Sequence, residues 1–166
     1  MLTNEQVLAD INSKFGDYVT DVADPFGMLT FTTTREKLVD LFRYLYDHKE
    51  FQYQFLTTLC GIHYPDQVGR ELGVVYHLHS LVQNHRIRIK TFVSIDNPLV
   101  PTLTGIYNSA NWQERETYDF FGIEFTGHPD LRRIMNVDEM DYFPLRKEYP
   151  LEDQQRRDKD DRMFGR

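Results

Sequence analysis

The sequence predicts an α+β fold in which two helices pack on a mostly antiparallel sheet, followed by a short helix and an extended C-terminal docking arm. Apolar residues recur at helical spacing in two segments, 4–15 and 35–47. The segments between and after them alternate or are rich in β-branched residues, which is typical of strands. Towards the end this patterning is lost, since more than half of the side chains from 145 to 166 are charged.

Each of the two predicted helices has an apolar stripe and a capping residue. The first begins at Thr3 or Asn4 and ends at Gly16, and the second begins after Thr34. Between the helices, the turn at 24–27 joins two short extended segments into a hairpin. The residues expected to face the core are Val7, Leu8, Ile11, Phe15, Leu38, Leu41, Phe42 and Leu45.

Three longer strands are expected after the second helix, over 51–64, 72–82 and 86–95. The last of them alternates basic residues with apolar or hydroxyl residues, so it should carry one basic, solvated face. The basic residues on that face are Arg86, Arg88 and Lys90. The order of helices and strands favours helices on one face of the sheet.

The second half of the chain has shorter and less regular signals. The expected elements are a linker at 97–101, a short helix at 102–108, a firmer helix at 111–121 capped by Gly122, an extended segment at 123–126, a turn at 127–130 and one helical turn at 131–135. We therefore divide the chain into an α+β core domain over 1–96, a docking segment over 97–140 and a charged arm over 141–166.

The arm has few large apolar side chains, and their burial returns less free energy than the ordering of its backbone costs. We expect it to be mobile or to be ordered by a partner. The chain from about residue 125 onward is expected to wrap a larger protein, with arginines and a lysine as donors to carboxylates on that partner. These basic residues are Arg132, Arg133, Arg146 and Lys147.

Composition excludes several classes of site. The formal charge of −7 and the pI near 5.3 argue against a nucleic-acid binder. A single cysteine, Cys60, cannot form an internal disulfide, a cysteine-based zinc site or an iron–sulfur cluster. No pair of glycines is spaced as in a dinucleotide-binding loop or a P-loop. The sequence shows neither a signal peptide nor an apolar run long enough to span a bilayer.

Two clusters of polar residues remain as candidates for chemistry. His77 and His79 share one face of a predicted strand and could hold a metal with a third ligand, although exposed strand histidines are the simpler interpretation. In the 111–121 helix, Arg115 and Asp119 could form an ion pair, and Glu114 could bond Tyr118. The helix could be solvated, or its charges could form a network that fixes the following turn. An acid/base pair is the catalytic alternative. The charged face of the 111–121 helix carries Trp112, Arg115, Glu116 and Asp119.

Three ordered motifs resemble those of the C subunit of NADH–quinone oxidoreductase, also called the thirty-kilodalton subunit of respiratory complex I. They are SANWQERETYDFFGI at 109–123, FTGHPDLRRI at 125–134 and PLRKEYPL at 144–151. The first contains every fixed position of the family pattern E-R-E, two residues, D, two residues, G-I. Tyr142 and Phe143 stand where the family usually has glycine and histidine, which concerns the local turn. Over residues 1–95 the resemblance is one of general layout.

The resemblance implies a non-catalytic scaffold subunit in the peripheral arm of a proton-pumping NADH–quinone oxidoreductase, with no catalytic, cofactor-binding or metal residues of its own. FMN, iron–sulfur clusters, NADH and quinone would be bound by other subunits. The implied partners are the large quinone-site subunit, of the forty-nine-kilodalton type, and neighbouring iron–sulfur subunits, on the cytoplasmic side of a bacterial membrane. The residues implied in docking are Trp112, Glu114, Arg115, Glu116, Asp119, Gly122, Gly127, His128, Pro129, Arg132, Arg133, Pro144, Arg146, Lys147 and Pro150.

Three alternatives stay open on the sequence. One is the corresponding subunit of a membrane-bound hydrogenase, which shares the E-R-E segment. Another is a free-standing acid/base hydrolase that uses Glu114, Glu116 and His128. The third is a binding module whose basic strand face meets an acidic partner.

Overall fold

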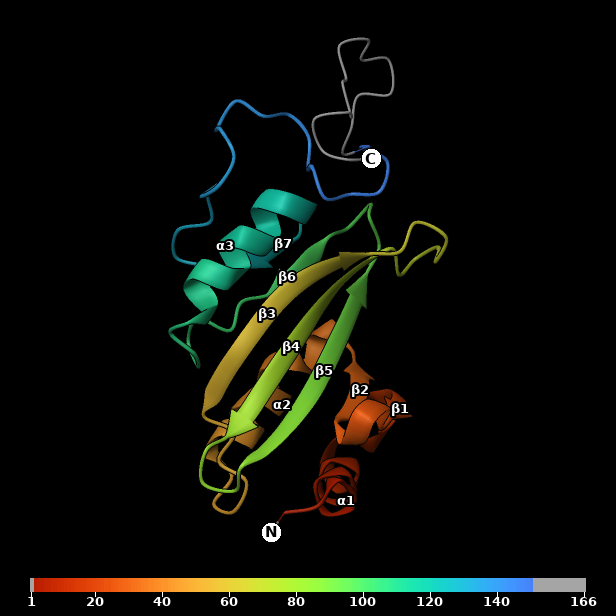
Figure 1. Cartoon of the computed structure of the whole chain (residues 1–166), viewed down its shortest axis with the longest axis vertical. Helices are drawn as coiled ribbons and strands as arrows, with labels where there is room; N and C mark the ends of the chain where they lie inside the picture. Colours follow the sequence, from red (N-terminus) through yellow and green to blue (C-terminus); the bar gives the residue numbers. More distant parts are fainter. Residues whose placement is uncertain (1, 151–166) are drawn as a thin grey trace, which may run out of the picture.

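The computed structural model describes residues 2–150 and is an α+β fold (Figure 1). A long sheet runs through the molecule, with helices behind it and beside it. The elements, in chain order, are α1 (Asn4–Phe15), β1 (Val19–Ala23), β2 (Leu29–Thr33), α2 (Arg35–Asp47), β3 (Phe55–His63), β4 (Leu72–Ser80), β5 (His85–Val93), β6 (Leu99–Pro101), α3 (Ala110–Phe121) and β7 (Glu124–Thr126).

Both N-terminal helices form where the periodicity predicted them. At the start of α1, the hydroxyl of Thr3 accepts from the backbone N–H of Gln6, and the Gln6 side chain accepts from the N–H of Thr3. This reciprocal capping satisfies two N–H groups that lack a helical partner. All eight side chains expected to face the core are buried or packed against it.

The main sheet is mixed but mostly antiparallel, in the order β1-β2-β5-β4-β3. Only β2 and β5 pair in parallel, because α2 and two further strands separate them along the chain. The predicted α+β fold class is confirmed. The predicted strand at 51–64 is shorter at its start, since residues 51–54 form an irregular turn before β3.

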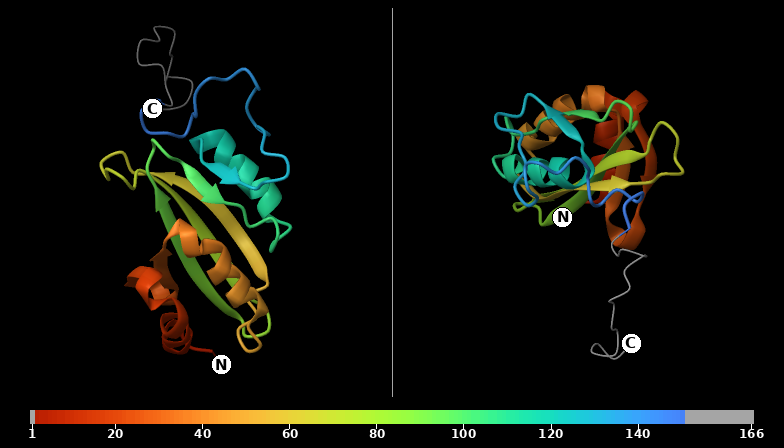
Figure 2. Two further views of the ribbon diagram at one scale, coloured as in Figure 1. Left: turned by 180° about the vertical axis from the view of Figure 1, so that it is seen from behind. Right: turned by 90° about the horizontal axis from the view of Figure 1, so that it is seen from above.

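The two faces of the sheet differ as the alternation predicted. One set of side chains from β4 and β5 is buried against α2, where the rings of Phe42 and Tyr76 meet edge to face at 4.9 Å. Seen from behind in Figure 2, α2 lies across this face. The opposite face of β3, β4 and β5 carries no helix among the described residues (Figure 1).

Three expectations for the second half of the chain were wrong. The expected linker contains β6, which pairs in parallel with β7. Residues 102–108 form hydrogen-bonded turns rather than a helix, because Leu103 O accepts from both Ile106 N and Tyr107 N without the pattern continuing. The helical turn expected at 131–135 is absent, since its backbone N–H groups bond a side chain of α3 instead.

The boundary expected at residue 96 does not separate two cores. The side chains of Val100, Leu103 and Ile123 belong to the same buried cluster as the sheet and helices. The hydroxyl of Tyr107 donates to the carbonyl of Tyr53 at 2.8 Å, and α3 packs along the edge strand β3. No described helix is both long enough and apolar enough to cross a membrane.

Candidate docking site

The helix α3 buries charged side chains and exposes its tryptophan. Glu114 and Asp119 are fully buried and Arg115 is 7% exposed, whereas Trp112 is 64% exposed. Glu116 is exposed as well. The interpretation of a plain solvated helix is therefore wrong. A buried charge costs several kcal/mol of folding free energy unless it has hydrogen-bond or ion-pair partners. These partners come from segments before and after the helix.

The carboxylate of Asp119 holds the loop that follows β7. It accepts hydrogen bonds from the backbone N–H groups of Ile134, Met135 and Asn136, at 2.8–3.1 Å. The guanidinium of Arg133 adds an ion pair at 2.8 Å. Burial alone would raise the pKa of this carboxyl, but the hydrogen bonds and the ion pair outweigh it and hold the pKa well below its usual range.

Arg133 and Arg115 bind the same loop through its carbonyl groups. Arg133 donates to the carbonyls of Met140 and Tyr142 with one nitrogen and bonds Asp119 with the other. Arg115 donates to the carbonyls of Arg132 and Arg133, at 3.2 and 3.4 Å. The i, i+4 pair expected between Arg115 and Asp119 does not form, because each side chain bonds the loop instead.

Glu114 holds the turn before the helix. Its carboxylate accepts from the backbone N–H of Leu103 at 2.7 Å and from the hydroxyl of Thr102. The bond to Tyr118 expected from the spacing is absent, since these groups occupy the carboxylate. Burial raises the pKa of Glu114 to about 7, although the two hydrogen bonds oppose that shift.

His128 lies against Glu114 with both ring nitrogens engaged. Nε2 is 3.1 Å from the carbonyl of Asn111 and 4.0 Å from the Glu114 carboxylate, and Nδ1 accepts from the N–H of Asp130 at 3.0 Å. These contacts assign the proton to Nε2 in the neutral ring. Glu116 lies elsewhere, in a small hollow lined also by Cys60. The three residues of the hydrolase hypothesis are therefore not assembled as one acid/base site.

The described part of the arm, residues 141–150, folds back over α3 and β3. Leu145 N–H donates to the carbonyl of Phe120, and Arg146 Nε donates to the carbonyl of Phe121 at 2.7 Å. Lys147 N–H donates to Nδ1 of His63, whose side chain is 2% exposed. These residues thus have partners within their own chain. The rest of the arm, 151–166, lies outside the described residues.

Two glycines in the site have positive φ angles, as the turns around them require. Gly122 ends α3 with φ 71°, and a Cβ atom there would collide with Phe143 and Arg146. Gly127 has φ 84° and has room for a Cβ, since the nearest atom is a methyl of Thr102 at 3.4 Å. The predicted C-terminal cap at Gly122 is therefore confirmed, and it also admits the arm.

Held in this way, the segments around α3 present apolar side chains to solvent. Met135 is 69% exposed and Val137 63%, both on the loop that Asp119 binds. The guanidinium of Arg115 lies 5.0 Å from the Trp112 ring and also donates to the carbonyl of Arg132. One buried side chain therefore contacts both the exposed tryptophan and the loop. We call Trp112, Met135 and Val137 the docking surface. Sequence reasoning found the tryptophan but missed Met135 and Val137, because nothing local marks them as exposed.

The other predicted docking residues differ in exposure and in their partners. Pro129, Arg132, Lys147 and Pro150 are exposed, and Pro144 is half-buried. Arg132 pairs with Asp130 at 3.0 Å, whereas Arg146 lies over the Phe143 ring at 4.7 Å. The arginines at 133 and 146 are thus engaged inside the chain rather than free to meet a partner.

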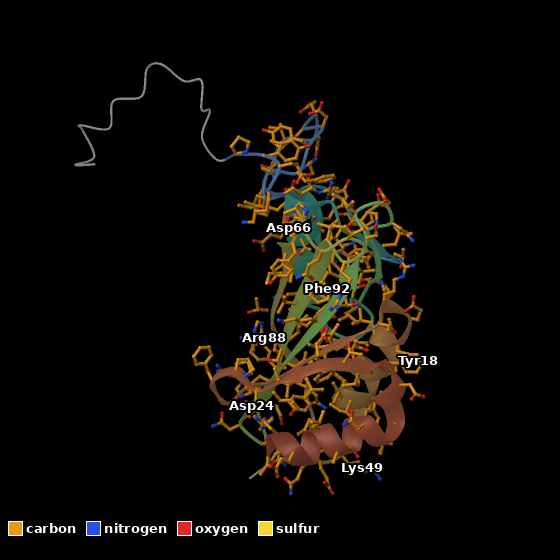
Figure 3. The ribbon with its side chains drawn as sticks, turned by 90° about the vertical axis from the view of Figure 1, so that its right-hand side faces the viewer. Tyr18, Asp24, Lys49, Asp66, Arg88 and Phe92 are labelled. Carbon is orange, nitrogen blue, oxygen red and sulfur yellow. The ribbon has the colours of Figure 1, made fainter. Side chains whose placement is uncertain are left out.

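The paired histidines of β4 form no metal site among the residues that the structure describes. His77 accepts a hydrogen bond from Arg88 Nε at 2.9 Å, and His79 lies 3.4 Å from the amide oxygen of Asn84. Both histidines project from the face of the sheet without a helix. Figure 3 shows Arg88 and Phe92 along β5.

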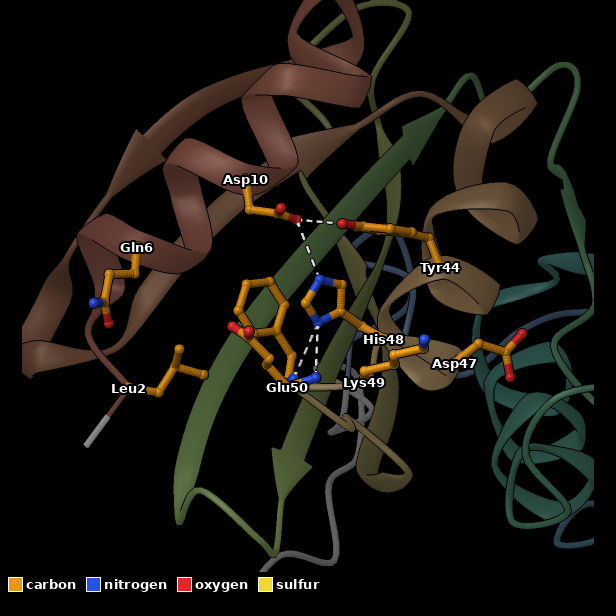
Figure 4. Close-up of a pocket in the computed structure, with 9 residues that line it drawn as sticks. Leu2, Gln6, Asp10, Tyr44, Asp47, His48, Lys49 and Glu50 are labelled. Atoms are coloured by element: carbon orange, nitrogen blue, oxygen red, sulfur yellow. Dashed lines mark hydrogen bonds and ion pairs between the residues drawn. The ribbon is translucent and has the colours of Figure 1, made fainter.

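A groove of about 690 Å³ between α1 and the end of α2 went unpredicted (Figure 4). In it the hydroxyl of Tyr44 donates to Asp10, and His48 lies 3.9 Å from the same carboxylate. His48 Nδ1 accepts from the N–H groups of Glu50 and Phe51, so the ring caps the turn after α2. These contacts explain the groove as a structural junction of the two helices.

Solved structures share this fold. It is shared with a chain of the membrane-bound sulfane sulfur reductase, an archaeal respiratory membrane complex, at 23% identity and a TM-score of 0.73, over 89% of this chain and 85% of that one. The trypsin-resistant fragment of Nqo5 matches with a TM-score of 0.65 and 34% identity, over 76% of this chain and 98% of the fragment.

The chain belongs to the family of the 30 Kd subunit of the respiratory-chain NADH dehydrogenase, whose family model matches residues 31–155. It is 43% identical to the C 2 subunit of the NADH-quinone oxidoreductase of Rhizobium etli, over 86% of this chain and 75% of that protein. It is 44% identical to the C subunit of the enzyme of Roseiflexus castenholzii, over 90% and 86%. The C subunit of Streptomyces coelicolor is 46% identical over 75% of this chain and half of that protein. The resemblance read from the three motifs is confirmed.

Proposed function

We propose that this chain is a non-catalytic scaffold subunit in the peripheral arm of a proton-pumping NADH–quinone oxidoreductase. The observation that carries the proposal concerns α3, the helix that contains the E-R-E motif. Its buried charges bond backbone groups of the same chain, and the result is an ordered loop with exposed apolar side chains. Such a surface, apolar with a charged rim, is suited to binding another protein.

The proposed partners are the large quinone-site subunit, of the forty-nine-kilodalton type, and neighbouring iron–sulfur subunits. FMN, the iron–sulfur clusters, NADH and quinone would be bound by those other subunits, and this chain would meet the membrane only through them. The proposed location is the cytoplasmic side of a bacterial membrane. Kinship with NADH-quinone oxidoreductase subunits supports this assignment over the hydrogenase alternative.

The first test places a charge on the docking surface. Val137→Glu puts a carboxylate among apolar groups that we expect to be buried in the assembled complex, where an unpaired charge costs several kcal/mol. We expect the variant chain to fold with an unchanged melting temperature and to be depleted at least tenfold from the complex purified from membranes. The measurement is native electrophoresis of membrane extracts from a strain that expresses only the variant.

Val68→Glu is the matched control, because Val68 is 92% exposed in the loop between β3 and β4, away from the docking surface. This control should assemble normally. Normal assembly of the Val137 variant would contradict the docking proposal. Normal assembly of both variants with lost NADH–quinone activity would instead point to a chemical role.

A further inference from the structure

The face of the sheet opposite α2 carries a row of basic side chains that no described helix covers (Figure 1). Arg86, Arg88 and Lys90 alternate along β5 with side chains of the core, so all three lie on this open face. Consecutive members of the row are about 7 Å apart, the repeat of two residues in a strand. β3, β4 and β5 contain no aspartate or glutamate. This is therefore a basic surface on a chain whose formal charge is −7.

The basic row lacks anionic partners within the described chain. None of its three side chains forms an ion pair with another described residue. Arg88 Nε donates to Nε2 of the neighbouring His77 at 2.9 Å. Arg70 and, more weakly, Lys90 hold the pKa of Asp21 below its usual range, but that carboxylate is paired with Arg70 at 2.8 Å. Three cations in a row repel one another, and an acidic surface laid on them would relieve that repulsion.

The open face also presents an exposed aromatic side chain. Phe55 begins β3 on this face and is 47% exposed. Across the strands it is in register with His79 of β4, which is in register with Arg86 of β5. Aromatic side chains and arginine are the residue types enriched at the centres of protein–protein interfaces. The combination on this face therefore indicates a protein partner.

A second aromatic side chain stands beside the open face on the hairpin between β1 and β2. Phe26 is fully exposed there and has a φ angle of 59°, which is strained for a residue other than glycine. Asn4 Nδ2 fixes the loop by donating to the carboxylate of Asp24 at 3.0 Å and to the carbonyl of Gly27 at 3.2 Å. Figure 3 shows Asp24 and Arg88 on the same side of the sheet. A ring held in place before binding loses little entropy when a partner covers it.

We propose that the open face of β3, β4 and β5 binds an acidic segment of another protein chain. Its carboxylates would pair with the basic row, and its apolar side chains would pack on Phe55 and Phe26. Carboxylates at alternate positions of an extended segment have the same spacing as the row. The charge of −7 favours a protein over a nucleic acid, whose negative charge extends beyond the contact. The proposal rests on the proposed function in that another subunit would supply the segment.

The first test titrates the full ¹⁵N-labelled chain with poly-L-glutamate at pH 7 and constant ionic strength. We expect saturable shifts of the amides from 86 to 90 and from 75 to 79. Arg86→Gln combined with Lys90→Gln should lower the affinity at least tenfold, because two cations of the row are lost. The bond between Arg88 and His77 is retained, so the melting temperature should be unchanged.

Arg43→Gln combined with Lys49→Gln is the matched control. It removes the same charge from exposed positions in α2 and the turn after it, and it should bind as the wild type does. Equal losses of affinity in the two double variants would show an effect of net charge and would overturn the proposal. Tighter binding of single-stranded DNA than of poly-L-glutamate at the same amides would overturn it in favour of a nucleic acid.

The second test examines the assembled complex. A photoreactive p-benzoylphenylalanine replaces Phe26 in a strain that has no other copy of the chain, and membranes are irradiated before purification. We expect cross-links to a peptide of another protein that contains more acidic than basic residues. Adding the Arg86 and Lys90 substitutions should reduce their yield several-fold. Cross-links only within this chain, or to a peptide rich in lysine and arginine, would contradict the proposal.

The two experiments separate this proposal from the proposed function. Incorporation of the chain into the complex is read from the same gels and tests the proposed function. A chain that assembles without a cross-link to another protein overturns the open-face proposal and leaves the proposed function standing. A chain that does not assemble but binds poly-L-glutamate through Arg86 and Lys90 contradicts the proposed function and supports the acidic preference of this face.

Discussion

At the scale of single residues, the charges of α3 stabilise the fold only through particular partners. Asp119 meets three backbone N–H groups and one guanidinium, so its charge is favoured in the folded chain. Glu114 meets two donors and, among the described residues, no lysine or arginine within ion-pair distance, with only the His128 ring at 4.0 Å. The two buried carboxyls of one helix therefore have opposite pKa shifts.

We predict that Glu114 makes the chain less stable as the pH rises. Its pKa is about 7 in the folded chain and about 4.5 in the unfolded one, so the folded state holds the extra proton between these values. Stability from this group is complete below pH 4.5 and is lost as the pH rises through 7. Glu114→Gln should remove the dependence, with wild type losing about 2–3 kcal/mol relative to the variant between pH 5 and 8.

Urea unfolding of both proteins across that range measures the difference. Other titrating groups are shared by the two proteins and cancel when their curves are subtracted. The glutamine amide still offers an acceptor to Leu103 and a donor to Thr102, which keeps the local structure comparable. Parallel curves would contradict a raised pKa at Glu114.

At the scale of elements, α3 forms hydrogen bonds to two irregular segments, one before it and one after it in the sequence. Glu114 bonds the turn at 102–103, whereas Arg115 and Asp119 bond the loop at 132–136. The helix itself was predictable, because its Gly cap and its length are local signals. Its orientation was not, since an alternation of charged and aromatic residues does not say which side is covered.

The glycine that caps α3 can be compared with a second glycine of positive φ, which serves as its control. Alanine at either Gly122 or Gly127 meets a positive φ angle, which costs about 1–2 kcal/mol. Only at Gly122 does the new methyl group also collide with Phe143 and Arg146. We therefore expect Gly122→Ala to lower the melting temperature clearly more than Gly127→Ala. Faster trypsin cleavage after Arg146 in the first variant alone would show displacement of the arm, and equal losses would argue against the packing described.

At the scale of the whole molecule, residues 97–150 are joined to the α+β core rather than appended to it. β6 and β7, which lie on either side of α3 in the sequence, pair with each other. The cluster of buried apolar side chains is continuous from α1 to Phe125. Residues 141–150 add contacts to α3 and β3 through Leu145, Arg146 and Lys147. Residues 141–150 are therefore part of the folded chain, and the docking surface of Trp112, Met135 and Val137 lies outside this segment.

Hydrogen exchange on the isolated chain tests this attachment. The amides of Leu145 and Lys147 have acceptors within the chain, so we expect them to exchange more slowly than that of Asp141, for which no such bond is present among the described residues. His63→Ala should accelerate exchange at Lys147 and leave Leu145 unchanged, because it removes one acceptor only. Uniformly fast exchange over 141–150 would mean that the arm is ordered only by a partner.

The sequence by itself determined α1, α2 and α3, the strands of the main sheet, the core stripes and the family, because all of these depend on spacing within short segments. It identified Glu114, Arg115 and Asp119 as a cluster but paired them wrongly. Only the tertiary structure decided which charges are buried, since their partners, Thr102, Leu103 and the 132–136 loop, lie in irregular segments outside the helix. A buried charge bonds the backbone groups that the fold places beside it. The periodicity of apolar residues along the sequence does not predict which groups these are.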